Sequence, residues 1–121
     1  RLACYTSRPT LSFIWAKRRR CVVGAYCVAK IDIHDQTTYA KYSEGFLKIL
    51  HRHKGRLLSV DEAPMILEGD WSVTRTVILE FEHKEAALTW YHSEEYQALA
   101  KFRFDASNGD VIVMDGIDLS E

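Results

Sequence analysis

The sequence predicts an α+β domain in which strands and helices follow the order β-α-β-β-α-β, with one extra short helix. Residues 25–33 alternate apolar and polar side chains, which is typical of a strand with one face in the core. Residues 39–53 repeat apolar side chains at helical spacing, and residues 73–81 alternate again. The chain has 121 residues, of which 47% are hydrophobic, and this is enough for one domain with an apolar core.

The first helix and the second strand have recognisable ends. Asp35 follows the first strand, where its carboxylate can cap the helix that comes next. Gly55 is a natural residue for this helix to stop at, because glycine adopts a left-handed backbone without strain. Residues 56–61 (RLLSVD) predict the second strand, which Ala63 and Pro64 then bend.

The middle of the chain is expected to form a hairpin. Residues 65–68 continue the same sheet edge beyond the bend, since a proline is tolerated at an edge. Residues 69–72 (GDWS) predict a turn, and residues 73–81 predict the third strand.

Two helices are expected after the third strand. The first starts near His83 and runs through residues 84–91 (KEAALTWY). Ser93 offers the N-cap of the next helix, and acidic residues at the following two positions suit the helix dipole. This helix is expected to end near Arg103.

A turn at residues 107–110 (SNGD) and a last strand at residues 111–116 (VIVMDG) complete the prediction. The element order is that of the ferredoxin-like sandwich, in which helices cover one face of a four-stranded antiparallel sheet. The other face also carries apolar side chains, so an isolated monomer would expose a large apolar surface. We therefore expect a homodimer through the open sheet face, with back-to-back sheets forming a dimeric α+β barrel.

Residues 1–23 form a basic N-terminal arm that we expect to be poorly ordered, beside a single folded domain at residues 24–121. Seven of the 16 Lys and Arg residues lie in residues 1–31, where there is no acid, and all 17 acids follow. A targeting segment, or a basic patch for a polyanion or a partner subunit, is an alternative to a leader without a role.

The overall composition limits the partners and the compartment. The net charge is −1, so neither a nucleic acid nor a membrane is expected as a partner, and no apolar run approaches the roughly 20 residues that span a bilayer. The cysteines Cys4, Cys21 and Cys27 are odd in number and lack CxxC spacing. This pattern favours a reducing, cytoplasmic location over a disulfide framework.

Three long stretches resemble domain-of-unknown-function family 1330, over about residues 24–116: AYCVAKIDIHDQTTYAKYSEGF, GRLLSVDEAPMILEGDWSVTRTVILEF and EAALTWYHSEEYQALAKFRFDAS. The most specific residues are Leu67, Glu68 and Gly69 with Trp71, then Arg75, and the Trp90, Tyr91, Ser93, Tyr96 run that ends at Arg103. The family belongs to the dimeric α+β barrel superfamily. The resemblance implies a homodimer with a cleft between sheet and helices. Superfamily members include cofactor-free monooxygenases, lactone isomerases and haem binders, but a shared fold does not transfer these activities.

Arg75 is the most unusual residue of the predicted sheet, because it falls on the apolar face of the third strand with Val77 and Leu79. A buried arginine needs a partner for its charge. Glu68 can reach it across the predicted turn, and Arg103 approaches from the last helix. The arginines either belong to an ion pair that fixes the hairpin and helix, or they anchor a small carboxylate or enolate-like ligand.

Aromatic residues accompany these charges and form either core or pocket walls. A pocket of this kind suits a small acidic or aromatic ligand, and Tyr91 or Tyr96 is a candidate proton donor. The expected ligand-binding residues are Glu68, Trp71, Arg75, Trp90, Tyr91, Tyr96 and Arg103.

No motif assigns a catalytic residue, a metal or a cofactor, and we expect neither metal nor cofactor. His51 and His53 point to different sides of a helix, and the chain has no HExxH, phosphate-binding glycine loop or G-x-S-x-G. Three functions stay open: a ligand-binding dimer, a cofactor-free oxygenase or isomerase for a small carbonyl or aromatic compound, and a structural dimerisation subunit without a ligand.

Overall fold

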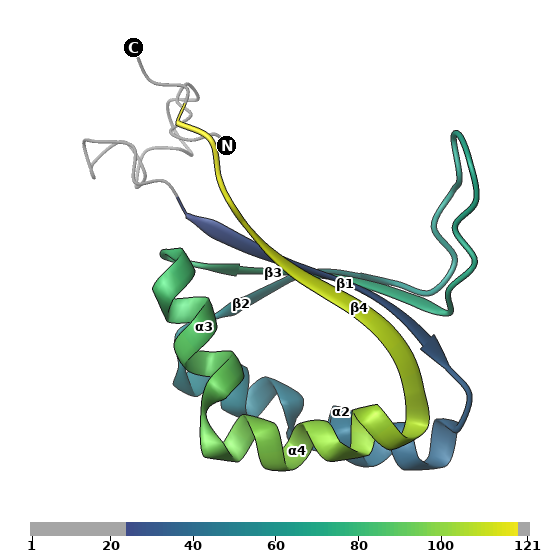
Figure 1. The fold of residues 1–121 in the computed structure, drawn as a ribbon, viewed down its shortest axis with the longest axis horizontal. Coiled ribbons are helices and arrows are strands. Elements are labelled where there is room, and N and C mark those ends of the chain that lie inside the picture. The colour runs from purple at the N-terminus through teal and green to yellow at the C-terminus, as the bar shows by residue number, and fades with distance from the viewer. Residues whose placement is uncertain (1–23, 119–121) are drawn as a thin grey trace.

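The computed structural model describes residues 24–118, so the predictions for residues 1–23 lie outside the described part of the chain. In chain order, its elements are β1 (Ala25–Ile33), α2 (Gln36–Arg52), β2 (Arg56–Asp61), β3 (Arg75–Phe81), α3 (Lys84–His92), α4 (Glu94–Ala106) and β4 (Ser107–Asp115). Within these residues, the strands form one antiparallel sheet in the order β2-β3-β1-β4, and the helices cover one of its faces (Figure 1). The predicted ferredoxin-like α+β fold is confirmed. No helix of the described residues is long and apolar enough to cross a membrane.

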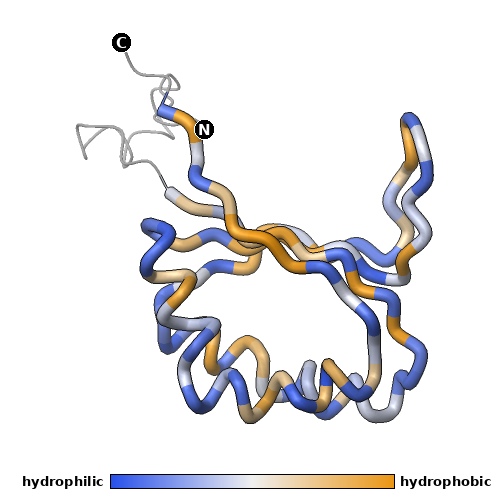
Figure 2. Tube along the Cα trace, viewed as in Figure 1, coloured by the Kyte–Doolittle hydropathy of each residue, from blue (hydrophilic) through white to orange (hydrophobic). Residues whose placement is uncertain are grey.

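The apolar core lies between the sheet and the helix layer. In β1, every second side chain from Ala25 to Ile33 is buried, as the alternation in the sequence predicts. Figure 2 shows hydrophobic residues running along the strands of the sheet. Phe81 from β3 and Leu50 from α2 are the largest fully buried side chains. Removal of this apolar surface from water is the main favourable contribution to folding.

A capping side chain stands at the start of each of α2, α3 and α4. An Asp35 carboxylate oxygen accepts a hydrogen bond from the Thr38 amide at 3.1 Å. The Ser93 hydroxyl accepts one from the Tyr96 amide at 3.2 Å, and His83 caps α3 through its ring nitrogen. The sequence predicts the Asp35 and Ser93 caps, and both are confirmed.

The end of α2 differs from the prediction at Gly55. The residue with left-handed backbone is Lys54, with φ 60°, one position earlier. Position 55 instead requires a glycine because there is no room for a side chain. A Cβ there would lie 2.5 Å from Leu50 Cδ1 and 2.7 Å from Phe81 Cε2. The glycine therefore lets the chain leave α2 tightly against the core.

The segment between β2 and β3 is an extension, which we call the β2–β3 arm (residues 62–74). It leaves the sheet on the side opposite the helices (Figure 1). The predicted continuation of the strand at residues 65–68 is wrong, because these residues are exposed and form no strand. The third strand starts at Arg75 and not at residue 73. Gly69 takes φ 80° at the end of a bend over residues 67–69, so the bend comes earlier than the predicted turn at residues 69–72 and shares only Gly69 with it.

The predicted turn at residues 107–110 is also wrong, because these residues begin β4. Helix α4 continues past Arg103 to Ala106, and β4 pairs with β1 from Ser107 onward, where Ser107 lies opposite Ile33. Polar residues of the turn-forming kind occupy this end of the strand, where they are largely exposed. Pairing with the central strand outweighs their turn preference.

The two glycines of the α2 region give a stability test. Replacing Gly55 with alanine should lower the free energy of unfolding by about 1–3 kcal/mol, because the new methyl group overlaps Leu50 and Phe81. Gly45→Ala is the matched control. Its Cβ would meet only the flexible end of Leu99 at 3.1 Å, and alanine favours the helix by up to about 1 kcal/mol. Urea denaturation measures both variants, and an equal loss in the two would contradict this account of Gly55.

Candidate functional site

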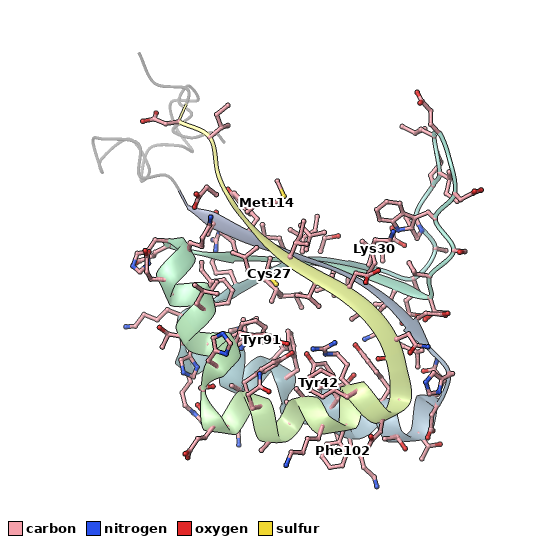
Figure 3. All side chains as sticks on the ribbon, viewed as in Figure 1. Cys27, Lys30, Tyr42, Tyr91, Phe102 and Met114 are labelled. Carbon is pink, nitrogen blue, oxygen red and sulfur yellow. The ribbon has the colours of Figure 1, made fainter. Side chains whose placement is uncertain are left out.

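A cavity of about 170 Å³ lies between the sheet and the helices. Every strand and every helix of the described residues contributes to its wall: Cys27, Ala29, Ile31, Tyr39, Tyr42, Ser43, Phe46, Leu57, Val60, Arg75, Val77, Leu79, Trp90, Tyr96, Arg103 and Val111. Figure 3 shows the Cys27 and Tyr42 side chains in this space. The central strand carries the small residues Cys27 and Ala29 on this side, which leaves room that the facing rings do not fill.

The cavity opens between α2 and the edge strand β2. Among the wall residues, Ser43 of α2 is exposed, and Val60 of β2 is 45% exposed although its side chain faces the cavity. The other positions of β2 are exposed too, except the half-buried Leu57. β2 is one of the two edges of the sheet, and its exposed positions mark where the core meets solvent.

Arg103 is the most unusual group in the cavity wall. Its side chain comes from α4 and is only 4% exposed, and its Nε has no hydrogen-bond partner among the residues that the structure describes. No carboxylate of residues 24–118 forms an ion pair with it. Its guanidinium carbon lies 5.7 Å from the ring centre of Tyr42 and 4.9 Å from that of Phe104. A buried charge of this kind is stabilised by rings but is not neutralised.

Two tyrosine hydroxyls lie beside this guanidinium. Tyr42 of α2 and Tyr96 of α4 share a buried hydrogen bond between their hydroxyl oxygens, at 2.7 Å. Burial raises the pKa of Tyr96, and the Arg103 charge offsets part of this rise. Burial raises the pKa of Tyr42 well above its usual value, and the neighbouring Tyr96 adds to the effect. Both phenols are therefore neutral at physiological pH and can donate hydrogen bonds.

Arg75 forms an ion pair near the opening, but its partner is not the predicted Glu68. Arg75 Nε donates to a Glu62 carboxylate oxygen at 3.1 Å, and a second guanidinium nitrogen contacts the same oxygen. The register explains this pairing: Asp61 lies opposite Thr76 across the β2–β3 ladder, which brings the next residue, Glu62, beside Arg75. The β2–β3 arm carries Glu68 away into an exposed position.

Four of the expected ligand-binding residues meet at the cavity, namely Arg75, Trp90, Tyr96 and Arg103. Trp90 is 2% exposed, and its indole nitrogen has no hydrogen-bond partner among the described residues. Tyr91 does not line the cavity, but its ring packs beside it, 5.5 Å from that of Tyr96. Figure 3 shows Tyr91 in the space between the sheet and the helices.

Trp71 and Glu68 are not brought to the cavity. The Trp71 indole donates to the Thr76 hydroxyl at 2.9 Å, and Lys30 Nζ lies 4.4 Å from the centre of a Trp71 ring. Figure 3 places Lys30 on the face of the sheet that the helices leave open. Trp71 therefore ties the β2–β3 arm to the opposite face from the cavity.

Among the titratable residues of the wall, sequence reasoning missed Tyr39, Tyr42 and Cys27. The two tyrosines lie three positions apart on α2, which places them on one face, and that spacing was the available signal. The Arg75 guanidinium carbon lies 5.1 Å from the ring centre of Tyr39. Burial raises the pKa of the Cys27 thiol to about 11, with Arg103 acting in the opposite direction, so this cysteine is an unreactive neutral thiol.

The wall holds few groups for acid–base or metal chemistry. Its titratable side chains are one thiol, three phenols and two guanidiniums, without a histidine or carboxylate among the described lining residues. Within residues 24–118, no cluster of three or more His, Cys, Asp or Glu side chains could hold a metal ion. What the arrangement offers is a buried positive charge with neighbouring hydroxyl donors in apolar surroundings.

Fold and site together define a ferredoxin-like α+β protein with a cationic, mostly apolar cavity. The family described as Domain of unknown function (DUF1330) matches residues 24–117, and the chain belongs to this family. No curated protein sequence matches the chain.

Several solved structures share the fold. A protein of unknown function from Rhodopseudomonas palustris has a TM-score of 0.66 at 12% identity, over 96% of this chain and 99% of that one. SnoaB, a cofactor-independent oxygenase from Streptomyces nogalater, has a TM-score of 0.58 at 11% identity, over 81% and 98%. A dimeric ferredoxin-like protein of unknown function from Jannaschia sp. CCS1 has a TM-score of 0.53 at 15% identity, over 76% and 96%. At these identities the likeness extends to the fold alone.

Arg103 can be tested for a structural role by replacing it with methionine, which has a similar length and no charge. The free energy of unfolding of Arg103→Met should stay the same or rise by about 1–4 kcal/mol, because a buried charge without a carboxylate partner is removed. Arg52→Met is the control. Arg52 pairs with Glu95 on the surface, so its loss should change stability by less than about 1 kcal/mol. A loss of several kcal/mol in Arg103→Met, measured by urea denaturation, would make Arg103 a structural residue.

Proposed function

We propose that this protein binds a small acidic ligand with an apolar or aromatic body in the cavity between its sheet and its helices. The observation that carries the proposal is the buried Arg103 guanidinium, which lines an apolar cavity without a carboxylate partner among the described residues. A charge in such surroundings is costly unless an opposite charge neutralises it. A carboxylate from a ligand would supply that charge.

The hydroxyl groups near Arg103 support an acid as the bound group. Tyr42 and Tyr96 are neutral and hydrogen-bond to each other, so a carboxylate oxygen could accept a hydrogen bond from one of them. Charge-assisted hydrogen bonds from a guanidinium and a phenol are strong in a site that excludes water. The ligand acid would therefore sit between α2 and α4.

The size of the cavity supports a ligand body of about one aromatic ring. Its volume is about 170 Å³. A protein cavity of about 150 Å³ holds a benzene molecule. Trp90 and Phe46 stand in the wall with their rings 6.3 Å apart at an interplanar angle of 85°, and they offer apolar contact to such a body.

A cofactor-free oxygenase or isomerase for a small carbonyl or aromatic compound is the second candidate. The likeness of the fold to SnoaB, a cofactor-independent oxygenase, favours it. Such chemistry needs a positioned acid or base with a pKa near the working pH. The phenols in the wall have raised pKa values, with burial as the largest cause, which suits them to hydrogen-bond donation more than to proton abstraction. The cavity therefore supports binding more strongly than catalysis.

We also infer that a second copy of the chain covers the open sheet face. Val28, Ile78, Ile112 and Met114 share this face, and Ile112 and Met114 are 53% and 49% exposed. Figure 3 shows Met114 on the side of the sheet away from the helices. The fold neighbours from Jannaschia sp. CCS1 and Bacteroides fragilis NCTC 9343 are both described as dimeric, which supports a homodimer. An exposed apolar patch flanked by polar residues is typical of such an interface.

The compartment that we propose is the cytoplasm. Cys27 is free and buried, and the odd number of cysteines in the sequence argues against a disulfide framework. The proposed ligand would then be a small intracellular acid.

Binding can be tested with benzoate as the probe. Benzoate should raise the melting temperature of the wild-type protein in a concentration-dependent way, since a ligand that binds only the native state stabilises it. The shift should disappear in Arg103→Met and persist in Arg52→Met, whose charge lies on the surface. Isothermal titration calorimetry on the same three proteins gives the affinities. Absence of binding by benzoate and by other small aromatic acids to the wild type would favour a structural subunit without a ligand.

The dimer interface can be tested with a charge on the open face. Ile112→Asp should shift the protein from dimer to monomer in sedimentation equilibrium, because a carboxylate would be buried without a partner between the two sheets. Leu88→Asp is the matched control: Leu88 belongs to α3 in the helix layer and is 44% exposed. A dimer that survives Ile112→Asp but dissociates in Leu88→Asp would place the interface on the helix layer.

A further inference from the structure

We infer that the ligand carries a second acidic group, and that this group replaces Glu62 on Arg75 at the opening of the cavity. This inference rests on the proposed function, because it concerns the same cavity. It specifies the class of ligand as an aromatic or apolar diacid. It also identifies Glu62 as a carboxylate of the protein that competes with the ligand for Arg75. Glu62 would then act as a built-in substitute for the second acidic group of the ligand.

Arg75 is placed to meet a second acidic group. Its side chain lines the cavity and is 23% exposed, so it stands where the cavity meets solvent. Glu62 is not a wall residue and is 61% exposed in its side chain, so it holds Arg75 from the outside. The Arg75 guanidinium therefore faces the cavity on one side and the largely exposed Glu62 carboxylate on the other.

The two arginines lie on either side of the tyrosines of α2. The Arg75 guanidinium stacks near Tyr39 at 5.1 Å, the rings of Tyr39 and Tyr42 lie 5.3 Å apart, and the Arg103 guanidinium lies 5.7 Å from Tyr42. The two positive charges thus stand at the two ends of a pair of rings. Both charges lower the pKa of Tyr39 against the larger effect of its burial, so both act in the same space. A ligand with one acid in the interior and another at the opening matches these positions.

The contact between Glu62 and Arg75 is weak enough to be exchanged. Exposed ion pairs contribute little to stability, because water and salt screen the charges and ordering the side chains costs entropy. Glu62 is also the first residue of the β2–β3 arm, directly after β2 ends. A second ligand carboxylate would also meet Arg75 at the solvent boundary, but the ligand would already be anchored by its first acid at Arg103, which makes the second contact effectively intramolecular.

The size of the cavity fits a ligand with one acid inside and a second acid at the opening. A volume of about 170 Å³ accommodates about one ring and the acid beside Arg103. A second acid would then project through the opening between Ser43 and Val60, toward the side where Arg75 is exposed. Benzene dicarboxylates with the two acids at ring positions 1 and 3 or 1 and 4 are the simplest ligands of this class.

Titration calorimetry with benzoate, isophthalate and terephthalate tests this inference on the intact chain. In the wild type, the tighter of the two diacids should bind about tenfold more strongly than benzoate, as one additional charge-assisted contact implies. Glu62→Gln should strengthen the binding of that diacid a further three- to fivefold, about the strength of the exposed ion pair that it removes. The affinity for benzoate should change less than twofold.

Two further variants separate a contact at Arg75 from a general charge effect. Glu68→Gln removes the same charge from an exposed position on the β2–β3 arm and should leave all three affinities unchanged. Arg75→Gln should reduce the affinity for the diacid to that for benzoate.

The outcomes distinguish this inference from the proposed function. If benzoate binds but neither diacid binds more tightly, or if Glu62→Gln has no effect on the diacid, the second acidic group is wrong and the proposed function stands. If none of the three probes binds the wild type, the proposed function fails and the inference fails with it.

Discussion

The buried guanidinium of Arg103 is the constraint on which the candidate site depends. Arginine does not lose its proton in a protein, so α4 places a permanent charge inside an apolar layer. Within residues 24–118, rings and phenolic hydroxyls surround this charge, and no carboxylate pairs with it. The fold alone holds the charge in place, ready for the acidic ligand that we propose. Binding to a preorganised group of this kind has a low entropic cost, because the group is already ordered in the folded protein.

The cavity around the Arg103 charge results from the sizes of the side chains that β1 and α2 turn toward each other. The central strand offers Cys27 and Ala29, which are short, whereas α2 offers Tyr39 and Tyr42, which are long and rigid. The helix packs on a twisted sheet, and its rigid rings face short side chains there. The two layers therefore do not interdigitate fully, and space is left between them. Because β2 is an edge strand with exposed positions, the same layer opens to solvent on that side. The interior charge, the space and the opening are therefore parts of one arrangement.

Alternation and capping signals predict most of the fold, because both depend on near neighbours in the chain. The apolar face of β1 and the caps at Asp35 and Ser93 follow directly from residue order. Arg75 lies on the apolar face of its strand in the sequence pattern, and its side chain lines the cavity in the structure. Its partner was not predictable in the same way. Whether Glu62 or Glu68 reaches it depends on where the strand ladder ends, and that is decided by pairing between strands and not by local sequence.

Nitrogen-15 NMR of the arginine side chains during a benzoate titration shows directly whether Arg103 binds the acid of the ligand. The Arg103 Nε–H group has no hydrogen-bond partner in the described structure, so its signal, assigned by its absence in Arg103→Met, should be sensitive to a new acceptor. If Arg103 binds the carboxylate, benzoate should shift this signal in a saturable way and slow the exchange of the Nε proton with water. The signal of the surface residue Arg52 should stay unchanged. If benzoate binds and the Arg103 signal does not move, the ligand acid is held elsewhere and Arg103 is not its anchor.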